Sequence, residues 1–238
     1  MKKRLKINGV VMFLTTILLV AFPTIFLRMD IIGPAEEVAE IFGIALILLG
    51  QLIRVSARGF KSGHSQNGFV LVQDGPYALV RNPMYLGIFL IGLGVVLMLF
   101  KWWVVAIFII FFVIRYILLI YTEEKRLVSL FPESYPAYCK DVPQRIFPSI
   151  TTLLEKDIHE YLPLKLKWIK REIGSISAVL FLVLLVESWG DISHGGIAVY
   201  LKGAAGMFAV IILFICLLGY LSRRTGNQNG SAKGQDNL

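Results

Sequence analysis

Apolar residues gather into six long runs that alternate with shorter polar segments along the chain. A helix needs about 20 predominantly apolar residues to cross a bilayer, and the runs approach or reach that length, the fifth being the shortest. The pattern therefore predicts an all-α, multi-pass transmembrane helical bundle of about six helices. The predicted spans are Val10–Leu27, Val38–Val55, Pro83–Phe100, Trp102–Tyr121, Ile173–Trp189 and Ala198–Leu221.

The distribution of lysine and arginine predicts the orientation of these helices, because cytoplasmic loops collect basic residues. The basic residues cluster at the N-terminus, around residues 54–81, in 123–172 and in the C-terminal tail. Six spans in the cell membrane, with both termini cytoplasmic, place each of these basic segments on the cytoplasmic side. The first run resembles a secretory signal, but no small-residue cleavage pattern follows it, so we expect it to be retained.

Composition narrows the classes of protein that fit. The 238 residues are 56% hydrophobic and only 17% charged, whereas soluble domains carry about a quarter charged residues. The net charge of +8 follows from topology and attraction to anionic lipid, so no nucleic-acid partner is expected. Cys139 and Cys216 lie in unlike surroundings and predict no disulfide. The three histidines have no metal-ligand spacing, so no metal site is expected.

Two segments on the predicted cytoplasmic side divide the chain into units. Residues 57–148 form the predicted core, in which a polar glycine-rich loop precedes the third span and a proline-rich stretch follows the fourth. Residues 1–56 hold the first two helices, 173–221 the last two, and 222–238 a disordered tail. Residues 149–172 are either an interfacial helix broken at Pro163 or a tether to the last helices.

The stretch from Gly75 to Gly87 marks the start of the third span. Asn82 suits the N-cap of a helix and Pro83 its first position. The free amides at that helix end carry partial positive charge, so the sequence predicts an anion-binding corner at the membrane surface.

Two motifs carry a resemblance to a known family. One is Gly75-Pro76-Tyr77 with Arg81-Asn82-Pro83-Met84-Tyr85-Leu86-Gly87. The other is Glu123-Glu124-x-x-Leu127 followed by Phe131, Tyr135, Tyr138, Val142-Pro143 and Arg145. In this order, each at a cytoplasmic helix end, they resemble the isoprenylcysteine carboxyl methyltransferases. That family belongs with the phospholipid methyltransferases, integral membrane enzymes that use S-adenosyl-L-methionine.

The resemblance implies a cofactor site made from both motifs. Asn82 stands where the family more often has histidine, so a proton-transfer role for histidine would be lost here. Arg81, Tyr85 and Glu123 are the implied catalytic residues. The implied cofactor-binding residues are Phe69, Val70, Leu71, Val72, Tyr77, Asn82, Pro83, Met84, Tyr85 and Glu123.

The chemistry of these residue types suits the cofactor independently of the resemblance. The capped helix end suits the cofactor's carboxylate, and Tyr77 and Tyr85 offer ring faces to its sulfonium cation. Glu123 suits the ribose hydroxyls or the amino group. Singly, each residue has a structural interpretation, such as a basic anchor or an aromatic-belt tyrosine; together they favour a cofactor site.

Two further residues are assigned to the substrate. The prenylcysteine enzymes have an arginine four residues before the first motif glutamate, where this chain has Leu119. The nearest arginine, Arg115, lies one turn deeper, and we expect it to meet an anionic substrate head, with Glu124 also on the substrate side.

The sequence thus predicts a membrane methyltransferase whose hydrophobic or prenyl-like acceptor comes from the bilayer, between the third and fourth spans. A carboxylate or thiol acceptor is favoured over an amine. One alternative is a membrane reductase of the sterol-reductase type using NADPH, which has a related helix-end motif. The other is a non-enzymatic transport or assembly protein.

Overall fold

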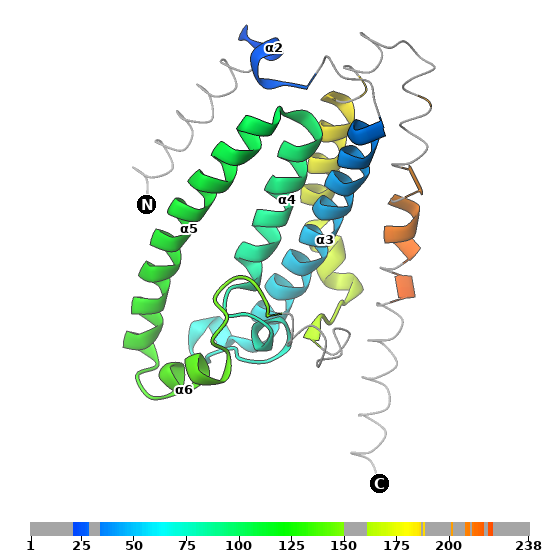
Figure 1. Cartoon of the computed structure of the whole chain (residues 1–238). Coiled ribbons are helices and arrows are strands. Elements are labelled where there is room, and N and C mark those ends of the chain that lie inside the picture. Colours follow the sequence, from blue (N-terminus) through cyan, green and yellow to red (C-terminus); the bar gives the residue numbers. More distant parts are fainter. Residues whose placement is uncertain are drawn as a thin grey trace.

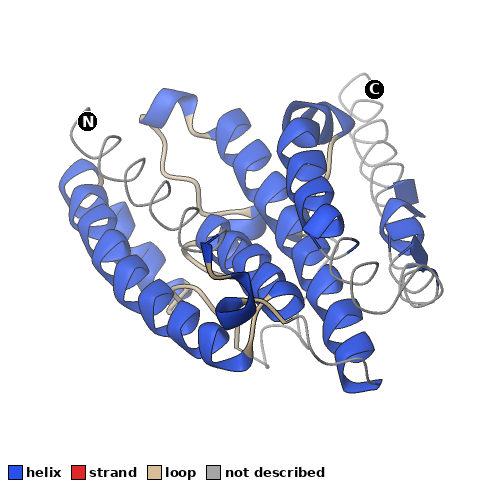
Figure 2. Cartoon of the chain, turned by 90° about the horizontal axis from the view of Figure 1, so that it is seen from above, coloured by secondary structure: helices blue, strands red, loops and turns tan. Residues whose placement is uncertain are grey.

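The computed structural model describes residues 21–28, 34–149, 161–186, 188, 201, 208–209, 211–216 and 219–220. These residues form helices and loops, with no strand among them (Figures 1 and 2), which confirms the all-α prediction for this part of the chain. Most of the predicted first and last spans, and the tail, lie outside the described residues. The elements are α2 (Pro23–Phe26), α3 (Pro34–His64), η1 (Gln66–Gly68), η2 (Gly75–Ala78), α4 (Pro83–Leu99), α5 (Trp102–Leu130), α6 (Ser134–Asp141) and a helix over 166–186.

Helix α4 nearly matches a predicted span, whereas α3 and α5 contain predicted spans and continue beyond their predicted ends at Val55 and Tyr121. By length and composition, α3 from Glu37 onward and α5 are able to cross a membrane. The 17-residue α4 is equally apolar but shorter. The helix over 166–186 begins earlier than the predicted span from Ile173, directly after a break that contains Pro163.

Close contact between α3 and α4 depends on two pairs of glycines. A Cβ atom on Gly50 would lie 2.6 Å from the carbonyl oxygen of Gly87, and one on Gly87 would lie 2.7 Å from that of Gly50. Gly43 and Gly94 face each other in the same way two turns away. Small residues allow membrane helices to pack backbone against backbone, and these four hold α4 directly against α3.

The helix over 166–186 also packs against α3 (Figure 1, yellow). Leu52 and Val55 of α3 form a buried cluster with Leu164 and Ile176. Nearer the α6 end, the buried Glu172 pairs with Arg58 at 2.7 Å and Arg54 at 3.6 Å. This helix therefore braces α3 through both apolar and ionic contacts, and none of its residues lines the cavity described below.

Helix α5 is held differently. It meets α4 at the short connection around Lys101 and diverges from it toward α6 (Figure 1). Aromatic side chains bridge the two helices: Phe89 contacts Phe112 with ring centroids 4.8 Å apart, and Tyr85 contacts Tyr116 at 5.1 Å. Most other apolar side chains of α5 are exposed, as expected of a lipid-facing helix.

The predicted loop from residue 57 begins too early, because α3 continues to His64. Tertiary contacts support the extra turns: Arg58 pairs with Glu172, Gly59 lies against Trp168, and Phe60 stacks on His64. The proline-rich stretch does not span, as predicted, but it contains the short helix α6, with Pro136 in its first turn, where proline is tolerated.

Candidate active site

A cavity of about 350 Å³ lies where the ends of α3 and α5 meet α6 and the loop before α4. Its volume falls within the range of about 300–1,000 Å³ typical of small-molecule sites. The lining residues are Lys61, Ser65, Gly68, Val70, Leu71, Val72, Tyr77, Arg81, Asn82, Met84, Tyr85, Glu123, Arg126, Leu127, Leu130, Phe131, Tyr135 and Tyr138.

Glu123 joins the two sequence motifs across this cavity. The Tyr85 hydroxyl, in the first turn of α4, donates a hydrogen bond of 2.7 Å to Oε2 of Glu123 near the end of α5. The Lys61 ammonium, from the last turns of α3, lies 3.8 Å from Oε1. Three helices therefore position one carboxylate, and its side chain remains 35% exposed.

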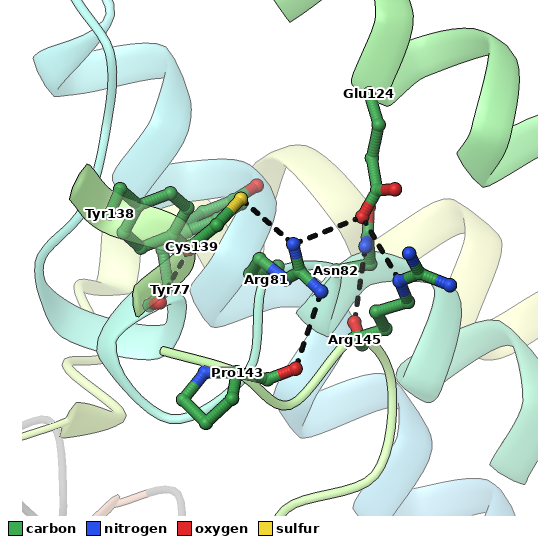
Figure 3. Close-up of polar contacts among 8 residues, drawn as sticks. All are labelled: Tyr77, Arg81, Asn82, Glu124, Tyr138, Cys139, Pro143 and Arg145. Atoms are coloured by element: carbon green, nitrogen blue, oxygen red, sulfur yellow. Dashed lines mark hydrogen bonds and ion pairs between the residues drawn. The ribbon is translucent and has the colours of Figure 1, made fainter. Parts of the chain in front are cut away.

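Arg81 is enclosed by partners from α5, α6 and the segment after α6 (Figure 3). Its guanidinium donates to Cys139 Sγ at 2.8 Å and to the Pro143 carbonyl at 3.2 Å, and pairs with Glu124 at 3.3 Å. Burial lowers the pKa of Arg81, but the hydrogen bond to Cys139 and the charge of Glu124 outweigh burial, so the pKa is raised. Arg81 is a permanently charged anchor for this corner.

Asn82 occupies the N-cap position, as predicted, but its side chain makes no capping hydrogen bond. Its amide nitrogen Nδ2 instead donates to the Arg145 carbonyl at 3.1 Å. The backbone amides of Arg81 and Asn82 donate to the carbonyls of Gln144 and Arg145, each at 2.9 Å. The amides of Arg81 and Asn82, which precede α4, are therefore already bonded to protein carbonyls, whereas the predicted anion-binding corner at the first amides of the helix itself stays a prediction.

These hydrogen bonds hold the segment 142–146 against the start of α4. A further hydrogen bond joins α6 to the loop before α4. The buried Tyr138 hydroxyl donates to the Tyr77 carbonyl at 2.7 Å. Burial raises the pKa of both Tyr77 and Tyr138, so both phenols stay neutral. The Tyr77 hydroxyl is buried with no hydrogen-bond partner in the described part of the chain. A polar group of a bound ligand would satisfy it.

Most predicted site residues come together in the cavity, but four do not line it. Phe69 is 83% exposed and Pro83 is buried in the helix start. Glu124 lies beside the cavity, held by Arg81 and, at 3.4 Å, by Arg145. Arg115 is exposed on α5, two turns from Glu123. The predicted roles of these four residues stay untested.

The sequence-based site missed half of the lining. Leu127, Phe131, Tyr135 and Tyr138 belong to the second motif, and their spacing of three or four residues places them toward one side of consecutive helices. That spacing was the signal that would have found them. Lys61 and Ser65 carried no such signal, because the predicted helix ended before them.

Residues 38–134 match the sequence model of a family described as Phospholipid methyltransferase. This segment contains α4, α5 and both glutamates of the second motif, so the match supports the predicted resemblance. Within this class, the chain is similar to the Protein-S-isoprenylcysteine O-methyltransferase of Schizosaccharomyces pombe. The two are 34% identical over 119 residues, which cover 46% of this chain and 50% of the relative. The chain thus aligns with about half the length of this relative. No solved structure matches the chain.

Proposed function

We propose that this chain is an integral membrane methyltransferase that uses S-adenosyl-L-methionine and acts on a hydrophobic acceptor. The observation that carries the proposal is the Tyr85–Glu123 hydrogen bond, which brings the two halves of the family motif together in one cavity. Six spans, cytoplasmic termini and a cytoplasmic site are part of this proposal, supported by the basic residues around the cavity.

The lining suits the proposed cofactor. Val70, Leu71 and Leu127 offer apolar contact to an adenine ring, and Glu123 is placed to accept hydrogen bonds from hydroxyl or ammonium groups. The rings of Tyr77 and Tyr85 are able to stabilise a sulfonium cation, an attraction worth about 2 kcal/mol when desolvated. When bound, the cofactor supplies an electrophilic methyl group.

The chain's own contribution to such a displacement is alignment in a site shielded from water. Tyr85 and Glu123 fix each other's orientation at the reacting end of the cavity. Arg81 was predicted to be catalytic, but its guanidinium is committed to Cys139, Pro143 and Glu124. We therefore assign it a positioning role, holding α6 and the segment after it against α4.

The acceptor is proposed to enter from the bilayer between α4 and α5. Ring contacts from Phe108 through Phe89 and Phe112 to Tyr116 and Tyr85 form a continuous row of aromatic side chains between the two helices that ends at Glu123. A carboxylate or thiol acceptor is favoured, since a carboxylate, or a thiol already ionised to its thiolate, is a nucleophile without a general base. The name of the fission-yeast relative, an O-methyltransferase, supports an oxygen acceptor.

The decisive experiment measures labelled methyl incorporation into membrane lipid and protein. We expect Tyr85→Ala and Glu123→Ala to abolish it, whereas Tyr121→Ala and Glu133→Ala, at exposed positions outside the cavity, retain it. Calorimetry in detergent should show binding of S-adenosylhomocysteine and none of NADPH. NADPH binding alone would instead support the reductase.

Arg115 has a separate test as a substrate contact. Its position inside an apolar span favours an anionic partner. Arg115→Gln should raise the KM for the acceptor without changing cofactor affinity; an unchanged KM removes Arg115 from the proposal.

A further inference from the structure

The basic side chains around the cavity differ in how strongly protein partners already bind them. Lys61, Arg81 and Arg126 line it, against the single carboxylate of Glu123. Arg81 is committed to three protein partners and is only 10% exposed. Lys61 is different: its side chain is 47% exposed, and its ion pair with Glu123 spans 3.8 Å between the ammonium and the carboxylate oxygen, longer than a hydrogen bond.

We propose that Lys61 binds the carboxylate of the cofactor's amino-acid head while Glu123 binds its ammonium group. This inference rests on the proposed function, because it concerns the same cavity. It assigns a binding role to a residue of α3 that belongs to neither sequence motif.

The geometry of the pair supports the assignment. An α-amino acid carries its ammonium and carboxylate on one carbon, so it complements a carboxylate and an ammonium that lie side by side. Lys61 and Glu123 form such a pair across the cavity, contributed by α3 and α5. A half-exposed ion pair contributes little to stability, so exchanging it for two charge-assisted contacts to the ligand costs little.

Several of the competing groups that could bind a carboxylate are already engaged. The amides of Arg81 and Asn82 at the start of α4 donate to the carbonyls of Gln144 and Arg145. Arg145 pairs with Glu124 and does not line the cavity. Arg126 is the remaining cation of the lining, one turn beyond Glu123 on α5, and it provides the alternative that the experiment must separate.

The test is equilibrium binding of two ligands to the full-length protein in detergent by calorimetry. The ligands are S-adenosylhomocysteine and its decarboxylated analogue, S-adenosyl-3-thiopropylamine, which keeps the ammonium and lacks the carboxylate. Lys61→Met should weaken S-adenosylhomocysteine binding about tenfold, as expected for losing one charge-assisted hydrogen bond, and leave binding of the analogue unchanged. Lys61→Arg, which keeps the charge, should recover most of the affinity.

Lys125→Met is the matched control, since it removes the same charge from a lysine that lies over the Tyr121 ring outside the cavity. The thermal midpoint of each variant reports folding. Equal loss for both ligands in Lys61→Met, or selective loss in Arg126→Met instead, overturns the assignment. Failure of the unaltered protein to bind S-adenosylhomocysteine overturns the proposed function itself; normal binding that Lys61→Met leaves intact overturns only the role of Lys61.

Discussion

Gly50 offers a direct link between helix packing and the proposed chemistry. In Gly50→Ala the new methyl group would lie 2.6 Å from the Gly87 carbonyl oxygen and 2.8 Å from the Ile91 amide nitrogen, where ordinary contact begins at 3.4 Å. Because both atoms are backbone, α4 has to move away from α3 by about 0.8 Å to relieve the contact. Overpacking of this kind costs about 1–3 kcal/mol.

The displacement reaches the site because Tyr85 lies two residues before Gly87. The hydrogen bond from Tyr85 to Glu123 is 2.7 Å long, and a shift of this size takes it beyond the usual range for hydroxyl donors. Misplacement by about 1 Å can reduce a rate by about 100-fold. We therefore expect kcat/KM for methyl transfer to fall by about 10- to 100-fold, with a lower thermal midpoint.

Gly174→Ala is the matched control, since a Cβ atom at this helical position meets nothing within 4 Å. It should keep full activity and gain up to about 1 kcal/mol of stability, because alanine favours the helix. Both variants are compared by labelled methyl transfer and thermal unfolding in the same detergent. If Gly50→Ala behaves like Gly174→Ala in both assays, α3 and α4 do not pack as described.

Two further predictions concern the segments around the cavity. Asn82→Asp keeps a residue type that caps helices well, but aspartate cannot donate a hydrogen bond to the Arg145 carbonyl. The free energy of unfolding, measured by thermal unfolding, should therefore fall by about 1 kcal/mol. An unchanged thermal midpoint would mean that Asn82 acts as a helix cap and that its bond to Arg145 contributes nothing. Because burial raises the pKa of Tyr77 and Tyr138, these phenols ionise first in the unfolded chain, so the free energy of unfolding is unaffected below about pH 10, the pKa of unfolded tyrosine, and falls as the pH rises further. Tyr138→Phe should therefore lose about 1 kcal/mol at pH 8 and show a smaller decline between pH 10 and 11, measured by denaturant titration; an equal decline in both proteins would contradict the assignment.

The sequence predicted helix bounds correctly where neighbouring residues alone determine them. The apolar runs located α4 and the start of α5 closely, although α5 continues to Leu130, beyond the predicted end at Tyr121, and the Asn82–Pro83 pair marked the start of α4. The predicted end of α3 was wrong because the last turns of this helix are polar and glycine-rich, which is typical of a loop. These turns contact Trp168 and Glu172, which are distant in the sequence, so no local pattern indicated the contacts.

The same distinction applies to the site. Tyr85 and Glu123 were predicted from their motifs, and the structure joins them. Apart from Glu124, the side-chain partners of Asn82 and Arg81 were not predictable, because they are backbone carbonyls and a thiol contributed by residues 139–145. The residue type of a side chain does not show which of several nearby polar groups it will form a hydrogen bond with.

The attachment of residues 144 and 145 to the start of α4 has a consequence for dissecting the protein. The segment that matches the family ends at residue 134, within the first turn of α6, yet the contacts that close the site come from residues beyond it. A fragment that ends at residue 134 would keep α4 and α5 but lose the hydrogen bonds from Arg81 and Asn82 to the carbonyls of Gln144 and Arg145. A fragment that keeps these contacts therefore has to extend at least through Arg145.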